Sequence, residues 1–226
     1  TDNTALGYVS MASITSGSYN TAVGGGDASG SGNPSMYRLT TGSYNVAVGN
    51  GSLGNSTTAS YNTAVGYQAG YGNTTGIYNT AIGYQSFASN TTGNYCTAGG
   101  YKALSANNGD NNTAFGFQAG QSITSGGQNV FIGGQCGITT TTGSNNAAVG
   151  PNAFISNSTG SNNTALGYYA LQANTTASNN VAIGPQTGYS TTTGNYNTAV
   201  GSNAFYYNTT GIQNTAIGGV ALYNNT

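Results

Sequence analysis

Short segments in which polar, small and branched apolar residues alternate recur along the whole chain. Residues 62–66 read Asn-Thr-Ala-Val-Gly, and residues 79–83 read Asn-Thr-Ala-Ile-Gly. Alternate residues of a strand face opposite sides, so the pattern predicts a short β-strand with Asn, Ala and Gly on one face and Thr and Val on the other. A helix is not favoured, because these segments lack both helix propensity and a 3.6-residue apolar stripe.

The glycine that ends each segment marks an internal repeat. Its thirteen copies lie 17 residues apart, except for an interval of 25 after Gly24 and one of 16 after Gly100. The copies are Gly7, Gly24, Gly49, Gly66, Gly83, Gly100, Gly116, Gly133, Gly150, Gly167, Gly184, Gly201 and Gly218. Self-similarity at a short fixed period is typical of solenoids. We therefore predict an all-β, parallel β-solenoid (β-roll) of about thirteen 17-residue coils, a single domain over residues 1–226 within a longer fibre.

Each copy is expected to hold two short strands and two turns. The first strand is the Asn-Thr-Ala-Val-Gly segment, and the second is the segment that follows it, Tyr-Gln-Ala-Gly at 67–70. Between copies lies Asn-Thr-Thr-Gly, as at 73–76, which is turn chemistry because Asn and Gly tolerate positive φ.

Two columns of small residues are expected to face each other across a narrow interior. One is the Ala of each first strand, interrupted only by Phe131, and the other lies three residues after each Gly, as at Ala69 and Ala103. The branched apolar residue of each strand then points outward. This outward column comprises Leu6 and the residues that we predict to form an oligomer interface: Val23, Val48, Val65, Ile82, Phe115, Ile132, Val149, Leu166, Ile183, Val200 and Ile217.

A continuous apolar column over a dozen coils is too large a patch for a monomer to leave in water. We therefore expect copies of the chain to cover it, side by side and, through the unpaired strand edges of the end coils, end to end. The competing interpretation places Val and Ile inside and Ala outside, and it needs no partner.

The Asn that begins each first strand also forms a column, as at Asn62, Asn79 and Asn146. Stacked amides can donate to one neighbour and accept from the other, so we expect a structural hydrogen-bonded ladder. Other asparagines begin Asn-x-Ser/Thr sequences, which are possible glycosylation sites. The six at the turn between coils, on an expected solvent edge, are Asn55, Asn73, Asn90, Asn157, Asn174 and Asn208.

Tyrosine is abundant, with 18 residues. Tyr19, Tyr44, Tyr61, Tyr78, Tyr95 and Tyr196 precede the Asn column, and Tyr8, Tyr67, Tyr84, Tyr101 and Tyr168 follow the Gly. Stacking within each column is the structural interpretation, and binding of glycans or other surfaces by the amphipathic rings is the alternative.

The two cysteines and the insertion are irregular positions in the pattern. Cys96 replaces an Asn and Cys136 replaces a small residue, about two coils apart, so we expect two small buried residues, with an interchain bridge as the alternative. The insertion after Gly24 holds Asp27, Met36 and Arg38. A protruding loop there could contact a partner, but solenoid loops also lengthen at little entropic cost.

Composition excludes several classes of function. Charged residues make up 2% of the chain, with a net charge of -1, and no apolar run reaches the length of a membrane span. Nucleic-acid binding and membrane insertion are therefore not expected. There is no His and only three acidic residues, so no catalytic pair, metal site or cofactor site is predicted. The Gly-rich segment at 24–30 lacks the Lys of a phosphate-binding loop.

The repeated Asn-Thr-Ala-Val/Ile-Gly, followed by Tyr-Gln-Ala and Asn-Thr-Thr-Gly, resembles the head repeats of trimeric autotransporter adhesins (YadA-like heads) and similar repeats in tail-fibre-like proteins. The resemblance covers essentially the whole chain. It implies a left-handed parallel β-roll, three chains around one axis, and display outside the cell as an adhesive or spacing fibre. The resulting hypothesis is an extracellular structural fibre, on a cell surface or a virion, without enzymatic activity. Alternatives are a receptor- or glycan-binding tail-fibre module and an ice-binding solenoid.

Overall fold

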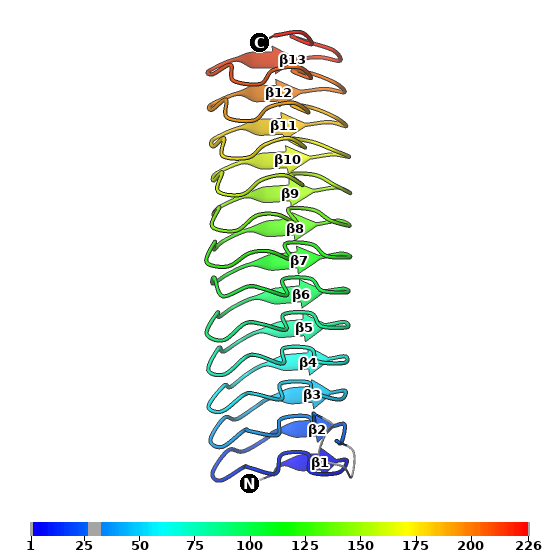
Figure 1. The fold of residues 1–226 in the computed structure, drawn as a ribbon, viewed down its shortest axis with the longest axis vertical. Coiled ribbons are helices and arrows are strands. Elements are labelled where there is room, and N and C mark those ends of the chain that lie inside the picture. The colour runs from blue at the N-terminus through cyan, green and yellow to red at the C-terminus, as the bar shows by residue number, and fades with distance from the viewer. Residues whose placement is uncertain (1, 27–32, 226) are drawn as a thin grey trace. The chain divides into compact units, whose positions relative to one another are not determined.

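The computed structural model describes residues 2–26 and 33–225 and confirms the parallel β-solenoid (Figure 1). Within these residues there are thirteen strands of three residues, one per coil. They are β1 (Thr4–Leu6), β2 (Thr21–Val23), β3 (Val46–Val48), β4 (Thr63–Val65), β5 (Thr80–Ile82), β6 (Thr97–Gly99), β7 (Thr113–Phe115), β8 (Val130–Ile132), β9 (Ala147–Val149), β10 (Thr164–Leu166), β11 (Val181–Ile183), β12 (Thr198–Val200) and β13 (Thr215–Ile217). The chain divides into two compact units, Thr1–Asn111 with β1–β6 and Asn112–Thr226 with β7–β13.

In the N-terminal unit the strands pair in parallel with equivalent residues opposite each other. Ala64 pairs with Ala81, for example, and Ala22 with Ala47 across the long interval. The insertion therefore leaves the register intact. Asp27 lies outside the described residues, whereas Met36 is fully buried and Arg38 is exposed.

The C-terminal unit has the same register. Its Ala column contains one large side chain, Phe131, which pairs with Ala114 below and Ala148 above. Among the residues that the structure describes, no helix is long and apolar enough to cross a membrane.

The predicted second strand is wrong. The segment after each Gly consists of turns, because residues of positive φ alternate with ordinary ones. Gln85 has φ 50° and Phe87 has φ 54°, on either side of Ser86. Left-handed residues turn the chain instead of extending it. The segment still bonds to the next coil, as in the 2.9 Å hydrogen bond from the Phe87 N–H to the Ala103 carbonyl.

The small columns do face the interior, as predicted. Ala64 and Ala69 are both fully buried. A further interior column, four residues after the repeat Gly, escaped the sequence analysis. It holds the large buried side chains Leu53, Phe87, Leu104, Phe154, Leu171 and Phe205, and glycines at the equivalent place in other coils. The positive φ at this position turns its side chain inward.

Large and small residues compensate each other in the interior. Gly137, with φ 60°, occupies this fourth position in the coil of Phe131. A Cβ added at Gly137 would lie 2.7 Å from the Phe131 ring. The Phe in the Ala column is therefore accommodated by the absence of a side chain opposite it.

This packing predicts that Gly137→Ala lowers the free energy of unfolding by about 2–3 kcal/mol, through the ring clash and the left-handed φ. Gly134→Ala is the control, because an added Cβ there meets no atom within 4 Å. In a Phe131→Ala background the cost of Gly137→Ala should fall to about 1 kcal/mol, the backbone contribution alone. Denaturant unfolding of the four variants measures this, and an equal cost in both backgrounds would contradict the packing argument.

Candidate interaction surface

The outward columns of the strand face form the main candidate surface. In the coil of β5, Tyr78, Ile82 and Tyr84 are exposed and Thr80 is half-buried. Ala81 between them is buried. The predicted orientation, with Ala inside and Val or Ile outside, is therefore confirmed, and the competing interpretation is wrong.

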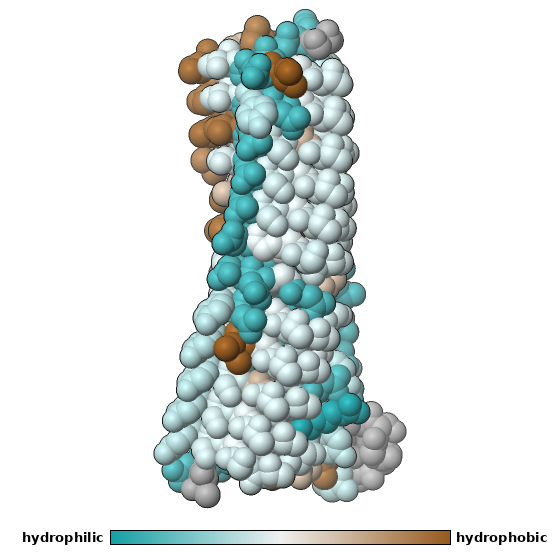
Figure 2. Space-filling view, turned by 90° about the vertical axis from the view of Figure 1, so that its left-hand side faces the viewer, coloured by the Kyte–Doolittle hydropathy of each residue, from teal (hydrophilic) through white to brown (hydrophobic). Residues whose placement is uncertain are grey.

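The residues predicted as an oligomer interface lie on this face. Val48, Val65, Ile82, Phe115, Ile132, Leu166, Ile183 and Ile217 are exposed, by 36% to 71%, and Val23, Val149 and Val200 are half-buried. Figure 2 shows hydrophobic side chains gathered along one edge toward the C-terminal end, beside a line of hydrophilic ones. No charged residue occurs in the column.

We call the column of outward apolar residues from Val23 to Ile217 the aliphatic column. The residues that lie beside it differ between the two units. In five successive coils of the N-terminal unit, the position before the Asn ladder is Tyr19, Tyr44, Tyr61, Tyr78 and Tyr95, which we call the Tyr ladder. In the C-terminal unit the same position holds Gln128, Asn145, Asn162, Asn179, Tyr196 and Gln213. All of these residues have positive φ, between 55° and 60°. Asn is the residue that adopts this conformation most readily after Gly.

Stacking is confirmed for the tyrosines that occupy one column in successive coils, whereas Tyr168 meets Tyr169 edge-on. Successive rings of the Tyr ladder have centroids 4.8–5.2 Å apart and interplanar angles of 4–13°. Tyr67, Tyr84 and Tyr101 form a second stack at 5.3 and 5.4 Å, and the Lys102 ammonium lies 5.4 Å from the Tyr101 ring centroid. In such stacks the ring faces cover one another, and the hydroxyl edges face outward.

The Asn ladder is also present. The Asn146 Oδ1 accepts from the backbone N–H of Asn163 at 3.0 Å and from its Nδ2 at 3.1 Å. The Asn146 Nδ2 donates to the Gly160 carbonyl at 2.9 Å. Each such side chain therefore satisfies backbone groups of the next coil and is itself buried. The role is structural, as the sequence analysis predicted.

We expected the glycosylation sequences to lie on a solvent-exposed edge, and this prediction is wrong for most of them. The side chains of Asn73, Asn90, Asn157, Asn174 and Asn208 are fully buried. Their side chains point inward and hydrogen-bond to backbone groups of the turn. For example, the Asn73 Nδ2 donates to the Gly76 carbonyl at 3.0 Å. Two of them are also joined to each other, because the Asn90 Nδ2 donates to the Asn73 Oδ1 at 2.8 Å. A glycan on these nitrogens would not fit inside the coil. Asn55 is half-buried.

Both cysteines are buried, as the simpler interpretation predicted. The Cys136 thiol donates to the Ala148 carbonyl at 3.3 Å. Burial raises the pKa of the Cys136 thiol from its ordinary value of 9.0 to about 12. The thiol therefore has no nucleophilic character near neutral pH.

Side chains that could bind a metal ion do not gather anywhere in the described chain. No three His, Cys, Asp or Glu residues within residues 2–26 and 33–225 could hold a metal ion together. The Asp110 Oδ1 accepts from the backbone N–H of Asn94 at 2.7 Å, so this carboxylate stabilises a turn. The surface can act through shape, apolar area and hydroxyl groups.

Comparison of the chain with family models, with curated proteins and with solved structures finds no match.

The Asn ladder predicts that Asn146→Ala lowers the free energy of unfolding by about 2–4 kcal/mol, because it leaves buried N–H and carbonyl groups without partners. The matched control is Thr142→Ala, which truncates an exposed side chain four residues earlier and should change stability by less than about 0.5 kcal/mol. Thermal or denaturant unfolding measures both, and equal effects would argue against the ladder.

The buried thiol predicts a pH-dependent loss of stability. Folded Cys136 stays protonated to about pH 12, whereas in the unfolded chain it ionises near pH 9. Its contribution is therefore full below about pH 9 and declines above it by about 1.4 kcal/mol per pH unit.

The control is Cys136→Ala, since Ala occupies this column in most other coils. Relative to this variant, the wild type should lose about 2 kcal/mol between pH 8 and pH 10.5. A difference that stays constant over this range would show that the thiol is not protected.

Proposed function

We propose that the chain is a structural, non-enzymatic β-solenoid that associates side by side with copies of itself through the aliphatic column. Its role would be that of an extracellular fibre or adhesin shaft on a cell surface or a virion. The observation that carries the proposal is the exposure of this uncharged aliphatic column in both units. An apolar surface of this extent is stabilised when a partner removes it from water.

The neighbouring strand column supports a dry interface. The first strand residue is Thr in nine coils, Val46, Val130 and Val181 in three, and Ala147 in one. Val has the shape of Thr without its hydroxyl, so twelve of the thirteen positions present a β-branched side chain, and a hydroxyl is not required at each of them. No hydrogen bond from a hydroxyl of these strand threonines occurs within the described residues, which is consistent with packing against another apolar surface.

The axial hydrogen bonds support the role of a stiff shaft. The corner threonines donate from their hydroxyls to the equivalent carbonyl of the next coil, as from Thr57 to Thr74 at 3.1 Å and from Thr192 to Thr209 at 3.1 Å. Together with the backbone and Asn ladders, they link successive coils within each unit. The likeness to trimeric adhesin heads favours three chains per fibre.

Two other candidate functions have some support. The Tyr ladder favours a glycan- or receptor-binding module. The regular outward threonines Thr63, Thr80 and Thr97 on adjacent strands favour an ice-binding face more than the turn threonines do. Thermal hysteresis of the purified protein tests the latter, and its absence removes that candidate.

Self-association predicts that Ile132→Asp combined with Ile183→Asp releases monomers, because each carboxylate would be desolvated in the interface. Thr142→Asp combined with Thr193→Asp is the control, with the same added charge on exposed corner residues. Light scattering measures the mass, and negative-stain microscopy shows the width and symmetry of the fibres. A wild-type chain that stays monomeric at high concentration would refute the proposal.

A further inference from the structure

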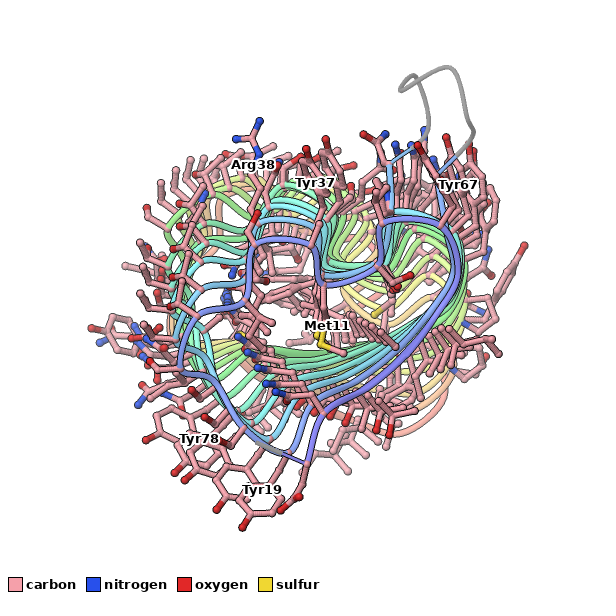
Figure 3. The ribbon with its side chains drawn as sticks, turned by 90° about the horizontal axis from the view of Figure 1, so that it is seen from below. Met11, Tyr19, Tyr37, Arg38, Tyr67 and Tyr78 are labelled. Carbon is pink, nitrogen blue, oxygen red and sulfur yellow. The ribbon has the colours of Figure 1, made fainter. Side chains whose placement is uncertain are left out.

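The Tyr ladder presents a row of hydroxyl groups at a nearly constant spacing. Its ring centroids are separated by 5.0, 5.1, 4.8 and 5.2 Å from Tyr19 to Tyr95. Each ring is about half exposed, between 46% and 56%. Figure 3 shows Tyr19 and Tyr78 at the same corner of the coil, both pointing away from the interior. The spacing is set by the stacking of coils and not by the rings themselves.

The hydroxyls on this corner have unused hydrogen-bonding capacity. Within the described residues, none of the five ladder hydroxyls makes a hydrogen bond to the protein. The same holds for the hydroxyls of Thr21, Thr63 and Thr80, which lie two residues further along the chain on the same outward side. The corner therefore combines five phenol groups with a parallel row of strand residues, of which all but Val46 are threonines, and neither row carries charge.

Backbone geometry does not explain why these five residues are tyrosines. The position requires positive φ, which is 59° at Tyr19 and 60° at Tyr61. Asn145, Asn162 and Asn179 adopt the same φ at the equivalent position of the C-terminal unit, and Asn does so at lower cost than an aromatic residue. Stacking offsets part of that cost, but Phe would stack equally well. The hydroxyl is the feature that neither backbone nor stacking requires.

The spacing selects the class of ligand. A polymer that contacts every ring must advance by about 5 Å per unit. An extended peptide advances by about 3.3 Å per residue, so it falls out of register. Nucleic acid needs cationic side chains, and the ladder has none. Extended β-1,4-linked pyranoses advance by close to the ladder spacing and carry hydroxyls along both edges.

From this match we infer that the Tyr ladder, with the adjacent strand threonines, binds an extended, neutral β-1,4-linked polysaccharide laid along the stack of coils. The sugar hydroxyls exchange hydrogen bonds with the phenol and threonine hydroxyls, one sugar to each coil. Each bond contributes little by itself. The rings are already fixed by stacking, so little side-chain entropy is lost, and contacts in register add along the polymer.

The Tyr ladder lies beside the aliphatic column. Thr63 separates Tyr61 from Val65 on the outward side of β4. Self-association that covers the strand threonines would therefore leave only the phenol hydroxyls available to the polysaccharide.

The test uses the full chain and measures binding to microcrystalline cellulose and to chitin, and calorimetric binding of cellohexaose and chitohexaose. Maltohexaose, an α-1,4-linked oligomer that curls out of register, is the mismatch control. We expect binding to at least one β-1,4-linked polymer, affinity that rises from disaccharide to hexasaccharide, and binding of maltohexaose that is at least tenfold weaker.

The decisive variant is Tyr44→Phe, Tyr61→Phe, Tyr78→Phe, which keeps the stacking and removes three hydroxyls. It should bind at least tenfold more weakly, as should the corresponding triple Asn variant, whose residues are those of the C-terminal unit. Tyr67→Phe with Tyr84→Phe, on the second stack, is the control and should bind as the wild type does. Unfolding curves and light scattering verify that folding and assembly are unchanged in each variant.

Three results would overturn the inference: no binding to cellulose, chitin or their hexasaccharides, equal binding of maltohexaose, or undiminished binding by the triple Phe variant. Because the aliphatic column is intact in all these variants, a change in assembly is measured separately from a change in polysaccharide binding.

Discussion

Within each unit, the coils are held by hydrogen bonds that run between equivalent positions of successive coils. Strands pair in register, so each residue stacks on its own counterpart one repeat away. Such a structure favours residues that are complementary to themselves. Asn can donate and accept, Thr can donate to a carbonyl above it, and Tyr can stack on Tyr. Like charges placed directly opposite would repel, which explains physically why only 2% of the residues are charged.

The same constraint governs the interior. Coils of 17 residues enclose little volume, so small side chains line two sides of the interior. Larger side chains occur only where the residue opposite them is small. Phe131 and Gly137 are the clearest pair. The chain also turns within a few residues, and it does so by placing Gln, Leu, Phe and Tyr in left-handed conformations that cost free energy at each position. Repeated axial hydrogen bonds compensate for that cost.

In such a molecule, the surfaces available for binding are columns of equivalent residues on successive coils, and not a pocket. A single outward residue, repeated at the coil spacing, becomes a continuous aliphatic surface or a row of hydroxyls. The aliphatic column supports association of copies, and the Tyr ladder supports recognition of a polymer with the same period. Each unit has an aliphatic column, and the two units place different residues beside it, so they present two kinds of surface.

Much of the fold was predictable because the repeat exposes the period directly. The number of coils, the in-register pairing, the inward Ala64 column, the outward Val65 column and the Asn ladder all follow from alternation and spacing. The Tyr ladder was also predicted, although the structure was needed to show that its ring faces are covered. Whether the aliphatic column is an interface cannot be read from one chain's sequence, since that depends on a partner.

Only the tertiary structure decided the path of the chain between the strands. Residues 84–87 were expected to form a second strand, but the positive φ of Gln85 and Phe87 makes them a turn and directs the Phe ring inward. Asn73 begins a sequence typical of an exposed glycosylation site, yet its amide is buried because the nearby Gly76 carbonyl needs a donor. The sequence determined which residues stack on one another. Which of them point inward depends on the sign of φ at each position and on the buried carbonyl groups that need a hydrogen-bond donor. Residue identity encodes neither of these.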